Sequence, residues 1–156
     1  MAYRVDMRDI HFNLFEKLGI ENLADFEAYK DFTAEDYKMI LNEAEKFAIN
    51  VIAPTLAATD KNGAKFVDGE VVIPDEVRDT IKKFNEGGWG AISASPELGG
   101  QGLPVTMFDG TVDIFFASNT GFSGYQGLTS STANLIADEG SDFLRETNCE
   151  KMLTGV

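Results

Sequence analysis

The feature that most constrains the fold is a long stripe of apolar residues at helical spacing. Its members lie three or four positions apart, or next to each other, and are Ile40, Ala44, Phe47, Ala48, Val51 and Ile52. Such spacing places all of them on one face of an α-helix. The stripe follows Thr33-Ala-Glu-Asp36, a capping-box-like start in which the hydroxyl can satisfy an otherwise unpaired amide. We predict a helix that begins near Thr33, is kinked or ended by Pro54, and excludes Gly63.

Similar helical patterns recur through much of the chain. Apolar residues at helical spacing occupy residues 12–29, with Gly19 as a stop between two groups. Pro74 is placed to open a helix that Gly87 ends, and Pro104 is placed to open a third. The side chains predicted to face inward in the last two helices are Val77, Ile81, Phe84, Phe108, Val112, Phe115 and Phe116.

The C-terminal third predicts one more long helix. We expect a glycine- and serine-rich turn over residues 118–124, then a helix that ends at Gly140, then a short helix over residues 142–152. The side chains expected to face inward in the long helix are Leu128, Leu135 and Ile136.

One segment predicts strands. Residues 65–72 contain two short apolar runs around Asp68-Gly69, a strong hairpin signal. No internal repeat or linker interrupts the chain. The expected fold class is therefore all-α, or mainly α, with one small β-hairpin.

Charge and composition exclude several classes of protein. A net charge of −13, from 26 acidic and 13 basic residues, argues against binding nucleic acid or anionic lipid. No run approaches the roughly 18 apolar residues of a membrane span, and the first residues do not resemble a signal peptide. With a single cysteine and a single histidine, we expect no disulfide and no metal site. We therefore expect a soluble cytoplasmic protein.

The glycine-rich stretch 87–104 does not fit the common phosphate-binding loops. It lacks G-x-G-x-x-G after a strand, and the chain has no G-K-S or G-K-T. Residues 121–125 lack the second glycine of G-x-S-x-G. The many acidic residues are best interpreted as solvated helix faces, so we predict no catalytic residue.

The same stretch is similar to a signature of a known family. Pro96-Glu97-Leu-Gly99-Gly100-Gln-Gly102 resembles the P-E-x-x-G-G-x-G motif of flavin-dependent acyl-CoA dehydrogenases, with one residue fewer between the glutamate and the glycine pair. The resemblance implies that this loop is a structural turn and not a contact to substrate. Its glycines would be needed for positive φ angles or for close approach of the backbone.

Other segments carry the resemblance along nearly the whole chain. Residues 47–54 resemble the kinked first long helix of the family's N-terminal helical domain, and residues 127–141 resemble its later helix and Gly-Ser turn. Residues 151–155 match the stretch that closes that domain. Residues 3–18 and the hairpin resemble a longer subgroup with an N-terminal extension, of the 3-methylmercaptopropionyl-CoA dehydrogenase type.

The resemblance implies a division into an N-terminal extension, residues 1–32, and the N-terminal helical domain, residues 33–156. The family's middle β-domain and C-terminal helical bundle, which hold the flavin and the glutamate base, are expected to be absent from this sequence. The complete enzyme would use FAD to oxidise acyl-CoA thioesters between Cα and Cβ. On this chain alone we expect no bound FAD and no catalytic or cofactor-binding residue, so the chain would be inactive by itself.

The resemblance also implies a role for three small residues. Gly127, Ser130 and Ser131 match positions that border the acyl-chain pocket in the family. The alternative is that these residues simply let two helices pack closely.

The expected partners follow from the missing domains. A surface that normally packs on them would be apolar, and the chain has 12 phenylalanines. We expect this surface to be covered by the β- and C-terminal domains, by a partner subunit or in a homo-oligomer. The alternative function is a stand-alone helical interaction module or a diverged non-catalytic subunit.

Overall fold

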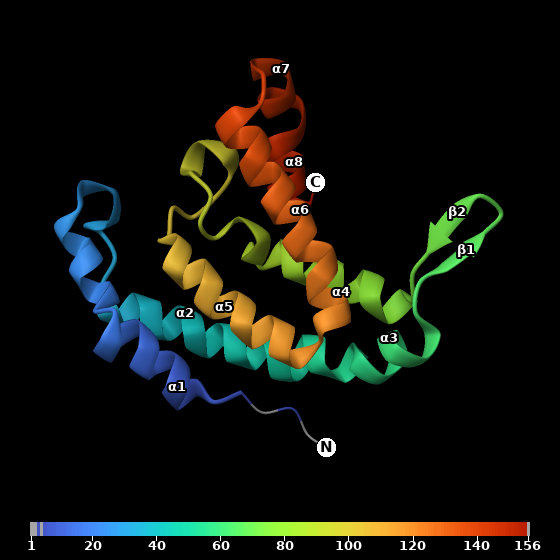
Figure 1. The fold of residues 1–156 in the computed structure, drawn as a ribbon, viewed down its shortest axis with the longest axis horizontal. Helices are drawn as coiled ribbons and strands as arrows, with labels where there is room; N and C mark the ends of the chain where they lie inside the picture. Colours follow the sequence, from blue (N-terminus) through green and yellow to red (C-terminus); the bar gives the residue numbers. More distant parts are fainter. Residues whose placement is uncertain (1–2, 4, 156) are drawn as a thin grey trace.

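The fold is built along one long helix, shown in a computed structural model that describes all residues except 1–2, 4 and 156 (Figure 1). Helix α2, Ala34–Phe47, begins with the predicted capping box. The amide of Asp36 donates to the Thr33 hydroxyl at 3.3 Å, and the Thr33 amide donates to the Asp36 carboxylate at 2.8 Å. The predicted helix start is confirmed.

The long helix becomes irregular at Pro54 and then continues. A wider, π-helical turn spans Ala48–Ile52, a tight 3₁₀ turn spans Ala53–Thr55, and helix α3 spans Leu56–Asn62. Because proline has no amide hydrogen and its ring crowds the preceding turn, regular α-helical bonding is interrupted there. The chain leaves the helix at Gly63, whose φ is +57°.

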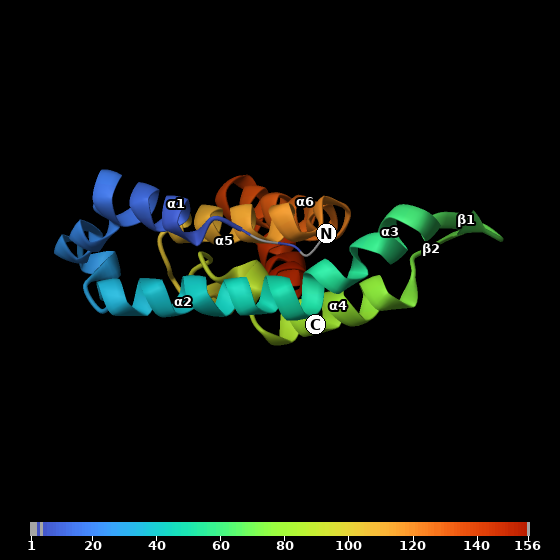
Figure 2. The same cartoon turned by 90° about the horizontal axis from the view of Figure 1, so that it is seen from below.

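The hairpin is present at the predicted place. Strands β1, Lys65–Val67, and β2, Glu70–Val72, pair antiparallel around Asp68 and Gly69, which have φ of +51° and +91°. Positive φ at both central residues is the requirement of a type I′ turn, which Asp-Gly meets. The hairpin projects from the helical body, and all six strand residues are exposed (Figures 1 and 2).

Three further long helices complete the helical body. They are α4, Asp75–Glu86, α5, Val105–Ser118, and α6, Thr120–Glu139. Of these, α5 lies along α2 and packs directly on it, and α6 crosses from the end of α5 toward the C-terminal helices (Figure 1). The starts after Pro74 and Pro104 and the end of α4 at Gly87 agree with the predictions.

Shorter helical segments complete the chain. At the N-terminus they are α1, Met7–His11, a π-helical turn at Phe12–Lys17, and 3₁₀ turns at Ile20–Asp25 and Glu27–Tyr29. Further on they are 3₁₀ turns at Trp89–Ala91 and Pro96–Leu98, then α7, Asp142–Leu144, a π-helical turn at Arg145–Cys149 and α8, Glu150–Thr154. The mainly α fold with one hairpin is confirmed.

The main core lies between α2 and its neighbours. From the predicted stripe, Ala44, Ala48 and Ile52 are fully buried, and they belong to one cluster with Met107 and Ile114 of α5. Helix α5 therefore buries a face toward α2 in addition to the face predicted from its phenylalanines.

The predicted turn over residues 118–124 is wrong. Helix α5 ends at Ser118 and α6 begins at Thr120, so Asn119 alone connects them. The Asn119 side-chain oxygen accepts from the Phe122 amide at 3.1 Å, and its amide donates to the hydroxyls of Thr55 and Thr59 at 2.9 and 2.8 Å. These bonds start the helix at once and override the weak helix propensity of the glycines and serines that follow.

The predicted inward face of α6 is also partly wrong. Leu128 and Leu135 are 75% and 62% exposed, whereas Ile136 is half-buried. The buried face carries Phe122 and Ala133 instead. Helix α6 thus has apolar side chains on two faces, and periodicity alone does not say which face meets the core.

The first 32 residues contribute to the core. Leu14 and Ile20 are buried in the main cluster, and the Tyr3 hydroxyl donates to the Ile114 carbonyl at 2.6 Å. Burial, with a smaller effect of the Glu45 carboxylate, raises the pKa of Tyr3 to about 12.

This raised pKa makes the N-terminal contact sensitive to alkaline pH. Because the folded state holds the Tyr3 proton more tightly than the unfolded chain, the contribution is complete below about pH 10 and is lost as the pH rises through about 12. We expect the free energy of unfolding, measured with denaturant, to fall less steeply over this range in Tyr3→Phe than in the parent. Tyr125→Phe is the control and should keep the parent's slope, and an unchanged slope in Tyr3→Phe would contradict this assignment.

Candidate functional site

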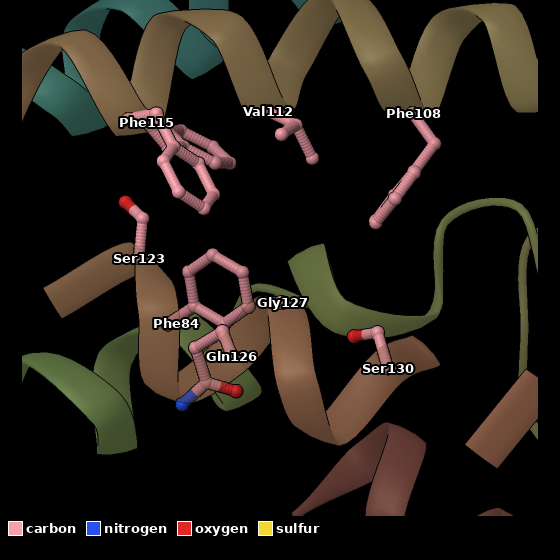
Figure 3. Close-up of a pocket in the computed structure, with 9 residues that line it drawn as sticks. Phe84, Phe108, Val112, Phe115, Ser123, Gln126, Gly127 and Ser130 are labelled. Atoms are coloured by element: carbon pink, nitrogen blue, oxygen red, sulfur yellow. The ribbon is translucent and has the colours of Figure 1, made fainter. Parts of the chain in front are cut away.

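The candidate site is a small cavity where α5 and α6 face each other beside α4 (Figure 3). Its volume is about 20 Å³. The residues that line it are Phe84 of α4, Phe108, Val112, Phe115 and Phe116 of α5, and Ser123, Gln126, Gly127 and Ser130 of α6. Several of these are only half-buried, so the cavity opens at the surface.

The walls are mostly aromatic, and the deeper rings are fixed by their neighbours. Phe84 and Phe115 pack edge to face with ring centroids 5.6 Å apart and an angle of 70°. Trp89 packs on Phe115 at 5.3 Å and 82°, and Phe47 packs on both phenylalanines. Such edge-to-face contacts restrict ring motion, so one wall of the cavity is rigid.

Among the described residues, no charged side chain lines the cavity, and the polar groups in its lining are few. The Ser130 hydroxyl donates to the Gly90 carbonyl at 3.3 Å. Ser123 is 4% exposed, and its Oγ has no hydrogen-bond partner in the part of the chain that the structure describes. The site can therefore contact an apolar group through its aromatic rings.

The unpaired Ser123 hydroxyl leads to a stability prediction. A buried polar group without a partner costs about 1–3 kcal/mol, and alanine also has the higher helix propensity. We expect Ser123→Ala to stabilise the chain by about 1 kcal/mol in denaturant unfolding. Ser130→Ala is the matched control because that hydroxyl is bonded, and it should be neutral or destabilising. A loss of stability in Ser123→Ala would show that Oγ has a partner.

The structure places two of the three predicted small residues at this cavity. Gly127 and Ser130 line it, whereas Ser131 is exposed and does not. A Cβ on Gly127 would lie 3.6 Å from the Phe116 ring, an ordinary contact, so a methyl group would fit there but a longer side chain would meet this ring. Ser130 instead meets Gly90, where a Cβ would lie 3.1 Å from the Leu153 carbonyl oxygen, so this pair allows close packing.

The helical spacing of the α5 phenylalanines predicts that they face inward, but it does not assign them to a site. In Figure 3, Phe108, Val112 and Phe115 point from α5 toward Gly127 and Ser130 on α6. Their spacing of three and four residues was a usable signal, because it puts them on one face of α5. Ser123 was missed because the predicted turn over residues 118–124 included it, whereas Gln126 lay in the predicted helix but was assigned no role.

The glycine-rich loop lies apart from the cavity lining. Gly99 and Gly102 have φ of +77° and +70°. A Cβ on Gly100 would overlap the carbonyl group of Ala94, and the Gly102 amide donates to that same carbonyl oxygen at 2.9 Å. The loop therefore folds back on the segment before it, while Pro96 and Glu97 are exposed.

The single histidine and cysteine take part in packing. The His11 ring stacks on Phe15 at 5.4 Å, and the buried Cys149 thiol lies 3.6 Å from the Ala133 carbonyl oxygen. Among the described residues, no group of three or more His, Cys, Asp or Glu side chains could hold a metal ion. Within the same part of the chain, none of the helices has the length and apolar character needed to cross a membrane.

The fold and the cavity define a helical domain that presents an apolar wall. Residues 34–156 match the family model "Acyl-CoA dehydrogenase, N-terminal domain", so the chain belongs to the acyl-CoA dehydrogenase family. It is similar to a 3-methylmercaptopropionyl-CoA dehydrogenase of Ruegeria pomeroyi, with 26% identity over 99% of this chain and 26% of that protein.

Other relatives agree with this assignment. A broad-specificity linear acyl-CoA dehydrogenase, FadE5, of Mycobacterium tuberculosis is 27% identical over 67% of this chain and 18% of its own length. A butyryl-CoA dehydrogenase of Syntrophomonas wolfei is 26% identical over 98% of this chain and 26% of its own length. Nearly the whole of this chain thus matches about a quarter of the length of these two relatives.

The cavity does not fit the FAD that the family resemblance implies. Ligand pockets for groups of that size usually enclose about 300–1,000 Å³, far more than this cavity, and its lining has no charged side chain for the phosphates. The described residues of this site supply a wall for an apolar group rather than an enclosure for a flavin.

Proposed function

We propose that the cavity between α5 and α6 forms part of the wall that holds the acyl chain of an acyl-CoA thioester. The observation that carries the proposal is an aromatic-lined cavity to which the described residues contribute no charged side chain, in a domain of this family. The curated relatives are named as dehydrogenases of acyl-CoA substrates, which favours the same substrate class here. FAD, held by other domains, would supply the hydride acceptor for oxidation between Cα and Cβ.

This chain's residues would contribute binding and orientation. Each methylene group that leaves water for the cavity contributes about 0.8 kcal/mol. The fixed rings of Phe84 and Phe115 would limit the positions that the bound chain can take, which orients the reacting end of the substrate. Gly127 would add no side chain to the wall, and Ser130 would hold α6 against Gly90.

We also propose that residues 33–156 form the helical domain and residues 1–32 an extension that stabilises it. Leu14 and Ile20 in the main core support this role. The extension covers α2 and α5 rather than the cavity, so it would act on stability and not on substrate.

Exposed apolar side chains on α6 and α7 are evidence that another protein surface covers them. Leu128 and Leu135, with Phe143 of α7 at 71% exposure, present apolar surface to water. We propose that the family's remaining domains or a second copy of this chain cover this face. Light scattering should show association, or a hydrophobic dye should bind the isolated chain and be released by Leu128→Glu. A monomer that binds no dye would contradict the proposal.

The function is tested by comparing this chain with a protein in which the middle and C-terminal domains accompany it. We expect the chain alone to stay colourless after incubation with FAD and removal of the excess, and to oxidise no acyl-CoA. The complete assembly should bind FAD and bleach its visible absorption when acyl-CoA is added. A flavin spectrum on the isolated chain, or an assembly that binds FAD but is not reduced by any acyl-CoA, would overturn the proposal.

A further inference from the structure

One side of the cavity is bounded by the ring of Phe116. The ring of Phe116, from α5, lies over Gly127 of α6. A Cβ built on Gly127 would lie 3.6 Å from Phe116 Cζ and 3.7 Å from Cε2. Any side chain at position 127 longer than a methyl group would therefore compete with this ring for the same space.

Phe116 differs from the rings deeper in the cavity. Phe115 is 4% exposed and packs edge to face against Phe84 and Trp89, so moving it would disturb the core. Phe116 is half-buried, and its ring faces a glycine instead of a side chain. Removing the Phe116 ring would therefore enlarge the cavity while the rings of the rigid wall keep their partners.

We infer that Phe116 closes the space in front of Gly127 and so sets the depth of the cavity, and with it the length of apolar chain that the site admits. The part of this inference that concerns acyl chains rests on the proposed function, whereas the part that concerns cavity depth does not. With Phe116 in place the cavity has a volume of only about 20 Å³, which suits a short apolar end. Without this ring, a longer chain would reach past Gly127 between α5 and α6.

The test uses toluene, an apolar probe that carries neither thioester nor CoA. Toluene binding is measured by titration calorimetry and by the rise in melting temperature, with circular dichroism confirming that each variant is folded. We expect Phe116→Ala to bind toluene at least about tenfold more tightly than the parent. Phe116→Leu is a milder change and should show a smaller gain in toluene affinity. It replaces Phe116→Ala in the test if that variant does not fold.

Two further variants separate this inference from general loosening of the structure. Phe15→Ala also removes a half-buried ring, but one that stacks on His11 and neither lines the cavity nor packs on its aromatic wall, so it should gain no binding. Gly127→Leu should destabilise the parent by clashing with Phe116, yet should restore stability and abolish toluene binding when combined with Phe116→Ala. Equal binding by the parent, equal gain in Phe15→Ala, or binding that persists in the double variant would overturn the inference.

Acyl-CoA kinetics then distinguish the role of Phe116 in cavity depth from the proposed binding of an acyl chain. In the complete assembly, Phe116→Ala should shift the kcat/KM preference toward longer acyl chains. If toluene binding follows Phe116 as expected but no acyl-CoA preference changes, the cavity depth is correctly assigned and the proposed function is wrong. If toluene binding does not follow Phe116, the inference about this residue fails whatever the acyl-CoA preference does.

Discussion

Replacing Gly100 with alanine is expected to destabilise the chain by about 3 kcal/mol, one of the largest effects of any single change considered. An added Cβ would overlap the backbone carbonyl of Ala94, which cannot turn aside as a flexible side chain could. That carbonyl already accepts from the Gly102 amide at 2.9 Å, and the Gly100 amide donates to the Ser95 carbonyl at 3.0 Å. Relieving the overlap would break these bonds and shift the loop, and overpacking of this kind costs roughly 1–3 kcal/mol or more.

The measurement is the free energy of unfolding in denaturant, with Gly124→Ala as the matched control. Gly124 lies inside α6, and a Cβ there would meet nothing within 4 Å. Alanine at this position should stabilise the helix by up to about 1 kcal/mol. If the two variants had similar stability, the loop would not be packed as the structure shows.

Replacing Asn119 with alanine is expected to cost roughly 2 to 3 kcal/mol. Loss of a helix-capping oxygen typically costs about 1 kcal/mol, and the two bonds to Thr55 and Thr59 are lost with it. Asn119 is 1% exposed, so water cannot replace these partners without rearrangement. The change would loosen two parts of the structure at once: the junction between α5 and α6, and the irregular part of the long helix.

An exposed helix cap provides the control for this prediction. The Ser141 hydroxyl accepts from the Leu144 amide at 3.4 Å at the start of α7, and Ser141→Ala should cost less than about 1 kcal/mol. A double-mutant cycle of Asn119→Ala with Thr59→Val should give a coupling energy of about 1 kcal/mol. Additive effects would show that the bond between Asn119 and Thr59 does not contribute to stability.

The elements that could be predicted from the sequence are those fixed by nearby residues. The helix start at Thr33 depends on a pair of residues three positions apart, and the hairpin depends on Asp68 and Gly69. Both are local interactions with a clear residue signature. The family could be recognised for the same reason, because its loop motif combines glycines with positive φ and a glycine in close backbone contact.

The errors concern residues whose structure depends on distant partners. The start of α6 is set by bonds from Asn119 to threonines about sixty residues earlier, which composition cannot reveal. The exposure of Leu128 and Leu135 could not be predicted for a similar reason. When a helix has two apolar faces, its own sequence does not indicate which face is buried.

The candidate site could be predicted in part. Gly127 and Ser130 line the cavity, whereas Ser131 is exposed and does not line it. The contribution of Phe116 could not be foreseen, because it depends on how α5 and α6 cross and not on either helix alone.

The central claim, that the cavity between α5 and α6 holds the acyl chain, is tested most directly by photochemical cross-linking. An acyl-CoA with a diazirine at the far end of a short acyl chain is bound to the assembly that includes the flavin-binding domains, irradiated, and mapped by peptide mass spectrometry. We predict labelling of cavity-lining residues in α5 and α6, such as Phe108, Val112 and Gln126, and its suppression by unlabelled acyl-CoA. Labelling confined to the outer face of α6 around Leu128, or to other parts of the assembly, would contradict the account.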